Sequence, residues 1–185
     1  MQKNIGLAGE EDEIIGYIKE GLEQYKQGEF TESAGNLDYA AQMIRQKKGG
    51  KLQAFLPEPL SGWTAEESTS QAAGAAMFGG GVTAERKYIK ESSSVTITIV
   101  TDSPMLQSMM MMFTNPMFMA SSGGKFEKIA GQKAIVKYNA SNQNGEITIV
   151  VANRFLITIK GNRVTRDEMV SYASTIDYGK LASLP

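Results

Sequence analysis

The chain has 185 residues, 42% of them hydrophobic, and its 19 basic and 20 acidic side chains leave a formal charge of -1 at pH 7. This length suffices for one domain, or for a small domain with a helical appendage, without disulfides, and the near-neutral charge gives no field to attract a nucleic-acid partner. The absence of cysteine and histidine excludes thiolate chemistry, histidine-based hydrolytic triads and metal sites built on those two ligands.

The N-terminal segment MQKNIGLAGEEDE contains no apolar run of the length that a secretory signal needs. About twenty consecutive apolar residues occur nowhere in the chain, so we expect no transmembrane span, with proximity to a membrane as an open alternative. The location is predicted to be periplasmic or in the cell envelope if a signal peptide has been trimmed, and cytoplasmic otherwise.

Residues 1–50 are predicted to form an antiparallel helical hairpin. The first helix, from Glu10 to Gln27, carries its apolar side chains on one face at Ile14, Ile15, Ile18, Leu22 and Tyr25. Gly28 ends it, and a second helix from Phe30 to about Gln46 carries a stripe of Ala34, Leu37, Ala41 and Ile44, with Ala40 beside it. The segment YKQGEFTESAGNLDYA resembles one tetratricopeptide unit. Because about three such units are needed for a continuous solenoid core, we expect a docked hairpin and not a peptide-binding array.

Residues 51–64 are predicted to be a linker that enters a core, because Pro57 and Pro59 hold the chain extended. Trp63, the only tryptophan, is expected to pack over a sheet and not to stack on a ligand. The Gly-rich run SQAAGAAMFGGG and the triplet Gly123-Gly124-Lys125 both lack the spacing of a phosphate-binding loop. We therefore predict no nucleotide site and no cofactor.

Residues 65–185 are predicted to form an α/β sandwich. Val82–Ile89, Val95–Thr101 and Lys125–Ala130 have the composition of strands. Three more strands follow in the segment KAIVKYNASNQNGEITIVVANRFLITIKG, where polar turns separate β-rich runs. A last helix is predicted within Arg163–Ala173, because Thr165 and Glu168 have the spacing of a capping box. The fold class is therefore α+β, with a helical hairpin before an antiparallel sheet of about five to six strands packed with helices.

The most unusual stretch, MLQSMMMMFTNPMFMA, contains seven of the eleven methionines. A helix from Pro104 that is apolar nearly all round is either buried or presents an adaptable apolar surface. Three interpretations stay open: core filling, a surface for a partner or lipidic ligand, and copper(I) bound by thioethers. The candidate contact residues are Met105, Met109, Met110, Met111, Met112, Phe113, Met117 and Phe118. The metal interpretation is the weakest, since copper sites usually add histidine or cysteine, and we predict no metal site.

Several motifs together are similar to those of uncharacterised bacterial envelope proteins. They are Gly62-Trp63 after Leu56-Pro57-x-Pro59, Asp102-Ser103-Pro104 before a helix, Gly131 and Lys133 at a turn, and a closing Asp177-Tyr178-x-x-Leu181. The order of strands and helices resembles the Mog1/PsbP-like sandwich, over about residues 52–184. The resemblance implies an envelope accessory protein, and it names no ligand or partner.

A non-enzymatic accessory or interaction protein is the leading hypothesis, with the Met-rich segment and the hairpin as contact surfaces. The alternative is a carrier of a lipid or another hydrophobic small molecule, with the Met-rich segment as a lid. Catalysis is not expected, because the best carboxylate candidates, Asp102 beside Ser103 and Asp167 beside Glu168, are explained as helix caps.

Overall fold

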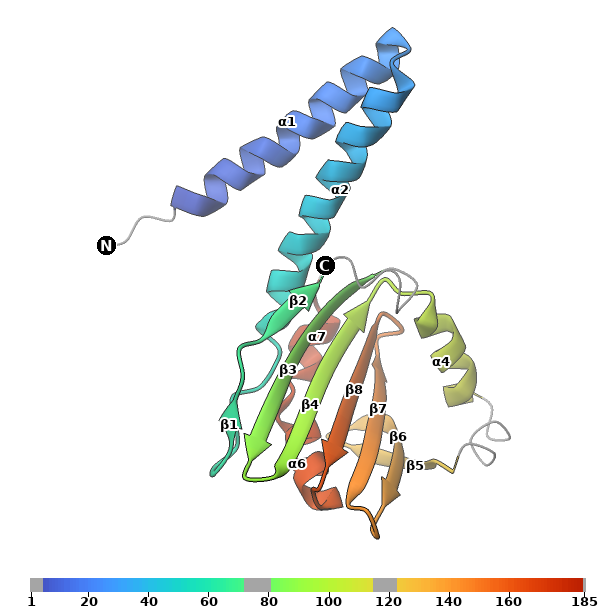
Figure 1. The fold of residues 1–185 in the computed structure, drawn as a ribbon. Helices are drawn as coiled ribbons and strands as arrows, with labels where there is room; N and C mark the ends of the chain where they lie inside the picture. Colours follow the sequence, from blue (N-terminus) through green and yellow to red (C-terminus); the bar gives the residue numbers. More distant parts are fainter. Residues whose placement is uncertain (1–4, 72–80, 115–122, 185) are drawn as a thin grey trace. The chain divides into compact units, whose positions relative to one another are not determined.

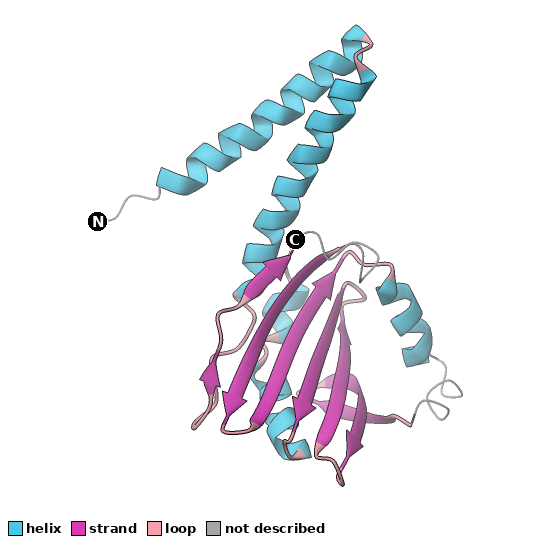
Figure 2. Cartoon of the chain, viewed as in Figure 1, coloured by secondary structure: helices cyan, strands magenta, loops and turns pink. Residues whose placement is uncertain are grey.

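The computed structural model describes residues 5–71, 81–114 and 123–184. Contacts within the chain divide it into two compact units, Met1–Lys48 and Gly49–Pro185. The first unit is helical, and the second contains the sheet, as the secondary-structure colours of Figure 2 show. The predicted α+β class, with a helical hairpin before an antiparallel sheet, is confirmed.

The hairpin consists of α1 (Ile5–Gln27) and the greater part of α2 (Phe30–Gln53), labelled in Figure 1. The chain reverses at Gly28, whose φ of 83° is accessible to glycine at little cost. The Gly28 N–H donates to the Tyr25 carbonyl at 3.2 Å, which closes the turn. α1 begins five residues before the predicted start at Glu10.

α2 also extends beyond its predicted end, through Gly49-Gly50 to Gln53. Glycine in a helix costs about 1 kcal/mol relative to alanine, so this continuation needs a compensating contact. Leu52 supplies one, since it is fully buried in the core of the second unit. A Cβ on Gly49 would lie 3.1 Å from the Ser70 Cβ, so the glycine permits close packing at this point.

The sheet has eight antiparallel strands in the order β1-β3-β4-β8-β7-β6-β5, with β2 also paired to β3. Six of them are the predicted strands: β3 (Val82–Lys90), β4 (Ser93–Thr101), β5 (Lys125–Ile129), β6 (Gln132–Asn139), β7 (Asn144–Val151) and β8 (Phe155–Asn162). The two additional strands are β1 (Thr64–Ala65) and β2 (Thr69–Gln71). They are too short and too polar to show the alternation by which strands are recognised.

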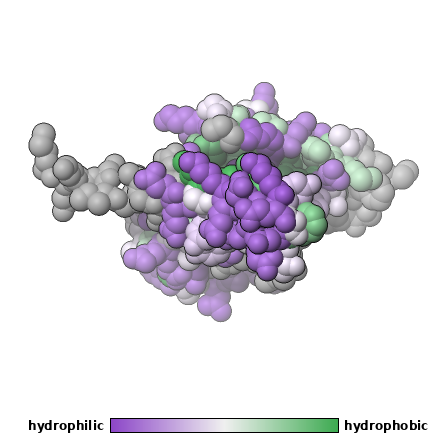
Figure 3. Space-filling model, turned by 90° about the horizontal axis from the view of Figure 1, so that it is seen from above, coloured by the Kyte–Doolittle hydropathy of each residue, from purple (hydrophilic) through white to green (hydrophobic). Residues whose placement is uncertain are grey.

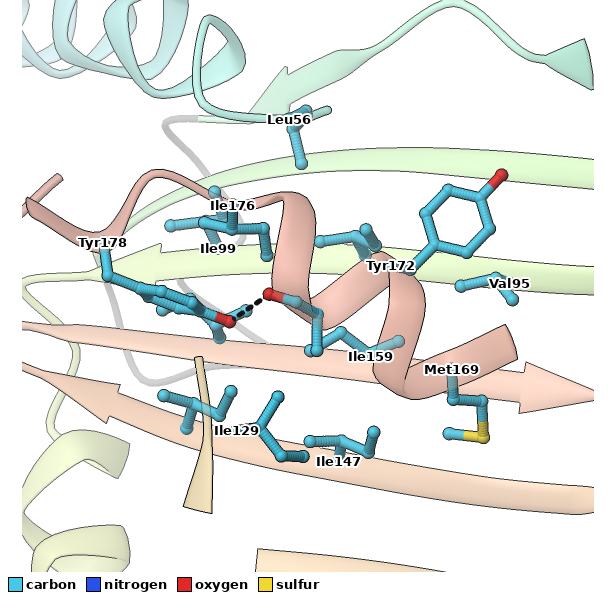
Figure 4. Packing of buried hydrophobic residues seen from close by; sticks show 14 of the residues in the cluster. Leu56, Val95, Ile99, Ile129, Ile147, Ile159, Met169, Tyr172, Ile176 and Tyr178 are labelled. Atoms are coloured by element: carbon cyan, nitrogen blue, oxygen red, sulfur yellow. Dashed lines mark hydrogen bonds between the residues drawn. The ribbon is translucent and has the colours of Figure 1, made fainter. Parts of the chain in front are cut away.

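One face of the sheet packs against α6 (Arg166–Thr175) and α7 (Tyr178–Ala182), which lie behind the strands in Figure 1. Alternate residues of the central strands form this core, among them Ile97, Ile147 and Ile157, each with no exposed surface. Figure 4 shows Val95, Ile147 and Ile159 of this core beside α6, which carries Tyr172 and Met169. Trp63 packs in the same core, with its ring 5.3 Å from that of Tyr172, as predicted.

The opposite face of the sheet contacts α4 (Met105–Thr114). A small separate cluster holds the helix there: Val100 of β4, Leu156 of β8 and Leu106 of α4 are buried, with Met109 and Val150 packed against them. The two faces therefore differ in kind. One is covered by a large core, whereas the small cluster at α4 is the larger of the apolar contacts that the described residues make on the other.

Candidate interaction surface

Among its described side chains, α4 buries only Leu106, which is 7% exposed. Met109, Met110, Met112 and Phe113 are half-buried, and Met111 is 63% exposed. We call the five residues Met109–Phe113 the Met surface. The backbone of Met105 lies in α4, but its side chain is outside the description, and Met117 and Phe118 lie outside the described residues. The structure thus places six of the eight candidate residues on one helix and describes the side chains of five.

The C-terminal end of α4 is anchored by a cluster on β5 and β6. The Lys133 ammonium of β6 donates to the Phe113 carbonyl oxygen at 2.6 Å. The same ammonium lies 4.2 Å from the centre of the Phe126 ring, and that ring is 6.2 Å from the Phe113 ring. A cation at a helix C-terminus is favoured by the helix dipole and by the carbonyls that lack helical partners. Lys133 and Phe126 therefore hold the Met surface in place.

A groove of 550 Å³ runs beside this anchored helix. Its lining is largely apolar on the helix side and polar on the sheet side, and consists of Gln107, Met110, Met111, Phe113, Thr114, Lys133, Val150 and Asn153. This volume falls in the range of small-molecule sites in proteins. The groove is therefore large enough for an apolar side chain of a partner or for part of a small hydrophobic ligand.

The sheet face beyond α4 is polar. Thr98, Thr158 and Thr148 are direct cross-strand neighbours on β4, β8 and β7, and they line a second groove of 310 Å³ that reaches Met109. Its charged residues are engaged with one another or with hydroxyls, since Glu85 accepts from Thr98 at 2.8 Å and Lys160 pairs with Glu146 at 3.8 Å. Apolar binding capacity on this face is thus concentrated at α4.

Figure 3 gives one view of the hydropathy of the molecule. From this side hydrophilic residues predominate, and hydrophobic residues appear as separate areas among them. Monomeric proteins rarely expose large contiguous apolar patches, so local clusters such as the Met surface call for an explanation.

The carboxylates considered in the sequence have structural partners. Thr165 and Glu168 form the predicted capping box of α6: the Thr165 hydroxyl accepts from the Glu168 N–H, and Glu168 accepts from the Thr165 N–H at 2.9 Å. This backbone hydrogen bond lowers the pKa of Glu168, and the Lys90 ammonium at 3.2 Å acts in the same direction. Asp167 pairs with Arg166 at 3.6 Å. Glu168 is therefore used as a helix cap.

Three tyrosines with raised pKa values belong to the core. Burial raises the pKa values of Tyr88, Tyr172 and Tyr178 above their ordinary value. The Tyr178 hydroxyl donates to the Ala173 carbonyl at 2.6 Å, the dashed line in Figure 4, and the Tyr88 hydroxyl donates to the Pro57 carbonyl at 2.7 Å. These groups support packing. Within the described ranges, no three Asp or Glu side chains are grouped as a metal site would require.

The sequence did not predict four residues as parts of this surface: Lys133, Phe126, Val150 and Asn153. They come from three strands and a turn, and only the register of the sheet and the docking of α4 bring them to one place. The alternation of β5 and β6 does put Phe126 and Lys133 on the face opposite the core. No pattern in the sequence indicates that Phe126 and Lys133 contact Phe113.

Searches against protein-family models, curated proteins and solved structures found no match. Among the helices that the structure describes, none is both long and apolar enough to span a membrane.

Proposed function

We propose that this chain is a non-enzymatic accessory protein that binds a partner protein through the Met surface. The observation that carries the proposal is the 63% exposure of Met111 on a helix whose described neighbours leave only Leu106 buried. If α4 served only to fill a core, its methionines would be covered by the rest of the fold. Half-buried and exposed methionines supply flexible, polarisable side chains that adapt to an apolar partner surface.

The anchoring of α4 supports the same proposal. Lys133 fixes the helix end through the Phe113 carbonyl, so the Met surface is presented on a positioned element. Pre-organisation reduces the entropy lost on binding, while the methionine side chains keep their adaptability. The 550 Å³ groove beside Met110 and Met111 would accept one apolar side chain of the partner.

The proposal includes a bacterial envelope setting. Its support is the similarity of Gly62-Trp63 and of Asp177-Tyr178-x-x-Leu181 to motifs of envelope proteins with a Mog1/PsbP-like sandwich. In the structure Trp63, Tyr178 and Leu181 are all buried in the main core. These two motifs thus concern packing of the core, and they contain no residue of the Met surface.

Site-specific photo-crosslinking in the native host tests the proposal. A benzophenone amino acid is placed at position 111, and in a matched strain at Ser171, an exposed position on α6. We expect one defined protein adduct at position 111 and none at 171. The purified partner should then bind the Met111→Ser variant about tenfold more weakly, the loss of one well-packed apolar contact. No adduct at 111, or equal adducts at both positions, contradicts the proposal.

A second candidate function is the transport of a lipid or another hydrophobic small molecule. It is favoured by the volume of the groove and by the apolar side chains of Met110, Phe113 and Val150 on its walls. Titration with cis-parinaric acid, a fluorescent fatty acid, tests it, with native mass spectrometry of protein purified from its host. Saturable binding that Val150→Glu abolishes would support a carrier. Absence of both saturation and a bound mass rejects it.

A further inference from the structure

The largest set of exposed apolar side chains lies in the helical hairpin and not on α4. Of the ten large hydrophobic residues exposed in the described chain, eight belong to α1 and α2: Ile15, Ile18, Leu22, Tyr25, Phe30, Leu37, Tyr39 and Ile44. Each has between 40% and 65% of its surface exposed. An isolated pair of helices gains little from leaving such residues in water, so their arrangement needs a reason.

The two helices contact each other mainly through a different line of residues, and of the outer residues Leu37 also reaches this contact, at Gly21. The Ser33 hydroxyl donates to the Gly21 carbonyl at 2.7 Å, and the Asn36 side chain donates to Gln24 at 2.9 Å. A Cβ on Gly21 would lie 2.9 Å from the Leu37 side chain, so glycine allows this close crossing. We call these lines the inner seams. Their residues are buried or half-buried: Ile14, Tyr17, Gly21 and Gln24 on α1, and Ser33, Asn36, Ala40 and Met43 on α2.

The exposed apolar residues form a second line on each helix, which we call the outer seams. On α1 it is Ile15, Ile18, Leu22 and Tyr25, and on α2 it is Phe30, Ala34, Leu37, Ala41 and Ile44. Both lines have the alternating spacing of three and four residues that marks a coiled-coil seam. The inner seams are small or polar by comparison, so the more apolar seam of each helix is the one left uncovered.

Both outer seams lie on the same side of the hairpin. Each follows its inner seam by one residue, which corresponds to a rotation of about 100° around the helix axis. The two helices run in opposite directions, so the same rotation about each chain's own direction is clockwise on one helix and anticlockwise on the other. Both outer seams therefore face the same side of the hairpin. The hairpin therefore presents a two-seam apolar surface, which is half of a four-helix bundle.

The charged residues that border the outer seams indicate which partner can cover this apolar surface. Asp12 and Lys19 border the seam of α1, and Asp38 and Arg45 border that of α2; all four are exposed. The Tyr17 and Tyr39 rings are 4.6 Å apart, so these residues lie level in the hairpin. Counting along the two antiparallel helices from this pair places Lys19 about level with Asp38, and Asp12 about level with Arg45.

From this pattern we infer that two copies of the chain associate through their hairpins into a four-helix bundle, with both turns at the same end. In that arrangement α1 faces α2 of the second copy, so Lys19 meets Asp38 and Asp12 meets Arg45 across the interface. With the turns at opposite ends and the seams fully overlapped, the two-fold axis would pass near the level of Lys19 and Asp38, because the seams 15–25 and 30–44 are centred there. Lys19 would then meet Lys19, and Asp38 would meet Asp38. The charges are thus self-complementary in one orientation, as a two-fold symmetric dimer requires.

Sedimentation equilibrium of the full chain tests the inference with a pair of charge reversals. We expect wild type to be dimeric at about 10 µM, and Lys19→Glu or Asp38→Lys alone to raise the dimer Kd about tenfold, since each replaces two attractions per dimer by repulsions. The double variant restores opposite charges and should return the Kd to within about threefold of wild type. Because these side chains are exposed, the variants leave the fold of the hairpin intact.

Two further variants separate this surface from the Met surface. Leu22→Glu, at the centre of the outer seam, should abolish the dimer, whereas Met111→Ser on α4 should leave the dimer Kd unchanged. The inference is overturned if wild type stays monomeric up to ~100 µM, if Leu22→Glu leaves the dimer intact, or if the double reversal is weaker than either single one. If Leu22→Glu unfolds the hairpin, the dimer Kd values of the charge-reversal variants still test the inference.

Discussion

Met111 and Leu106 lie on the same helix but have opposite environments, and this difference can be measured. Leu106 is 7% exposed in the small cluster with Val100 and Leu156, whereas Met111 is 63% exposed. We expect Leu106→Ala to lower the free energy of unfolding by about 2 kcal/mol, at the low end for buried leucine because the cluster is small. Met111→Ala should change it by less than about 0.5 kcal/mol. Urea unfolding of both variants measures this, and equal losses would make Met111 a core residue.

Lys133 is a second residue whose contribution to the stability of α4 can be measured. Its ammonium bonds to the Phe113 carbonyl and lies over the Phe126 ring, and both contacts are lost in Lys133→Met. We expect a loss of about 1 kcal/mol, since the pair is exposed, together with faster amide exchange in the last turn of α4. Lys128→Met is the matched control, because Lys128 is the cross-strand neighbour of Lys133 on β5. If both variants exchange alike, Lys133 does not anchor the helix.

At the scale of elements, α6 depends on its N-terminal cap. The pKa of Glu168 is lowered by the hydrogen bond from the Thr165 backbone, so the folded state favours the ionised carboxylate more than the unfolded state does. Its stabilising contribution is therefore present at neutral pH and is lost as pH falls, beginning near pH 5. We expect Glu168→Gln to destabilise the chain at pH 7 by about 1 kcal/mol and by less at pH 3. Urea unfolding at both pH values measures it.

The matched variant for this cap is Thr165→Ala, which removes the hydroxyl that accepts from the Glu168 N–H. The hydroxyl also donates to the Glu168 carboxylate at 2.9 Å, so part of the cost of about 1 kcal/mol depends on pH. The part that comes from the bond to the Glu168 N–H should persist at acid pH. An equal pH dependence of the two variants, or none in either, would contradict the role given to the Glu168 carboxylate.

The elements differ in how far the sequence predicted them. Strand β4 alternates apolar residues with threonine, β8 begins with a more continuous apolar run, and the capping box of α6 is a local signal, so all three were predictable. The stripe of α1 was predicted as one apolar face, but the structure divides it into an inner seam at Ile14 and Gly21 and an outer seam at Ile18 and Leu22. Periodicity identifies an apolar face, whereas the contact between Gly21 and Leu37 decides which part of it is covered.

The candidate site was predictable to a smaller degree. Met109–Phe113 were identified by composition alone, because a run of four methionines is unusual in any sequence. Whether they lie in the core or at the surface depends on the neighbours of α4, and those come from β5, β6 and the turn after β7. Such neighbours are distant in sequence, and no local pattern encodes their approach.

At the scale of the whole molecule, the main core as the described residues form it lies within the second unit. Its first members along the chain are Leu52 and Leu56, which follow the boundary between Lys48 and Gly49. A chain that starts at Gly49 therefore keeps every buried residue of that core, whereas a chain that starts at Glu58 loses both leucines. The position of these leucines makes the last turn of α2 part of the sheet unit in energetic terms.

We accordingly expect the chain 49–185 to unfold cooperatively in urea, with a midpoint close to that of the corresponding transition in the full chain. The chain 58–185 should be less stable by at least about 4 kcal/mol, since removal of a buried leucine side chain costs about 2–5 kcal/mol and two are lost. Near-ultraviolet circular dichroism reports on the environment of Trp63, which packs on Tyr172 only in the folded core. A non-cooperative transition for 49–185 would show that the hairpin is needed for the sheet to fold. Equal stability of the two truncated chains would show that Leu52 and Leu56 contribute little to the core. Their burial stabilises the chain only if their removal takes away favourable contacts.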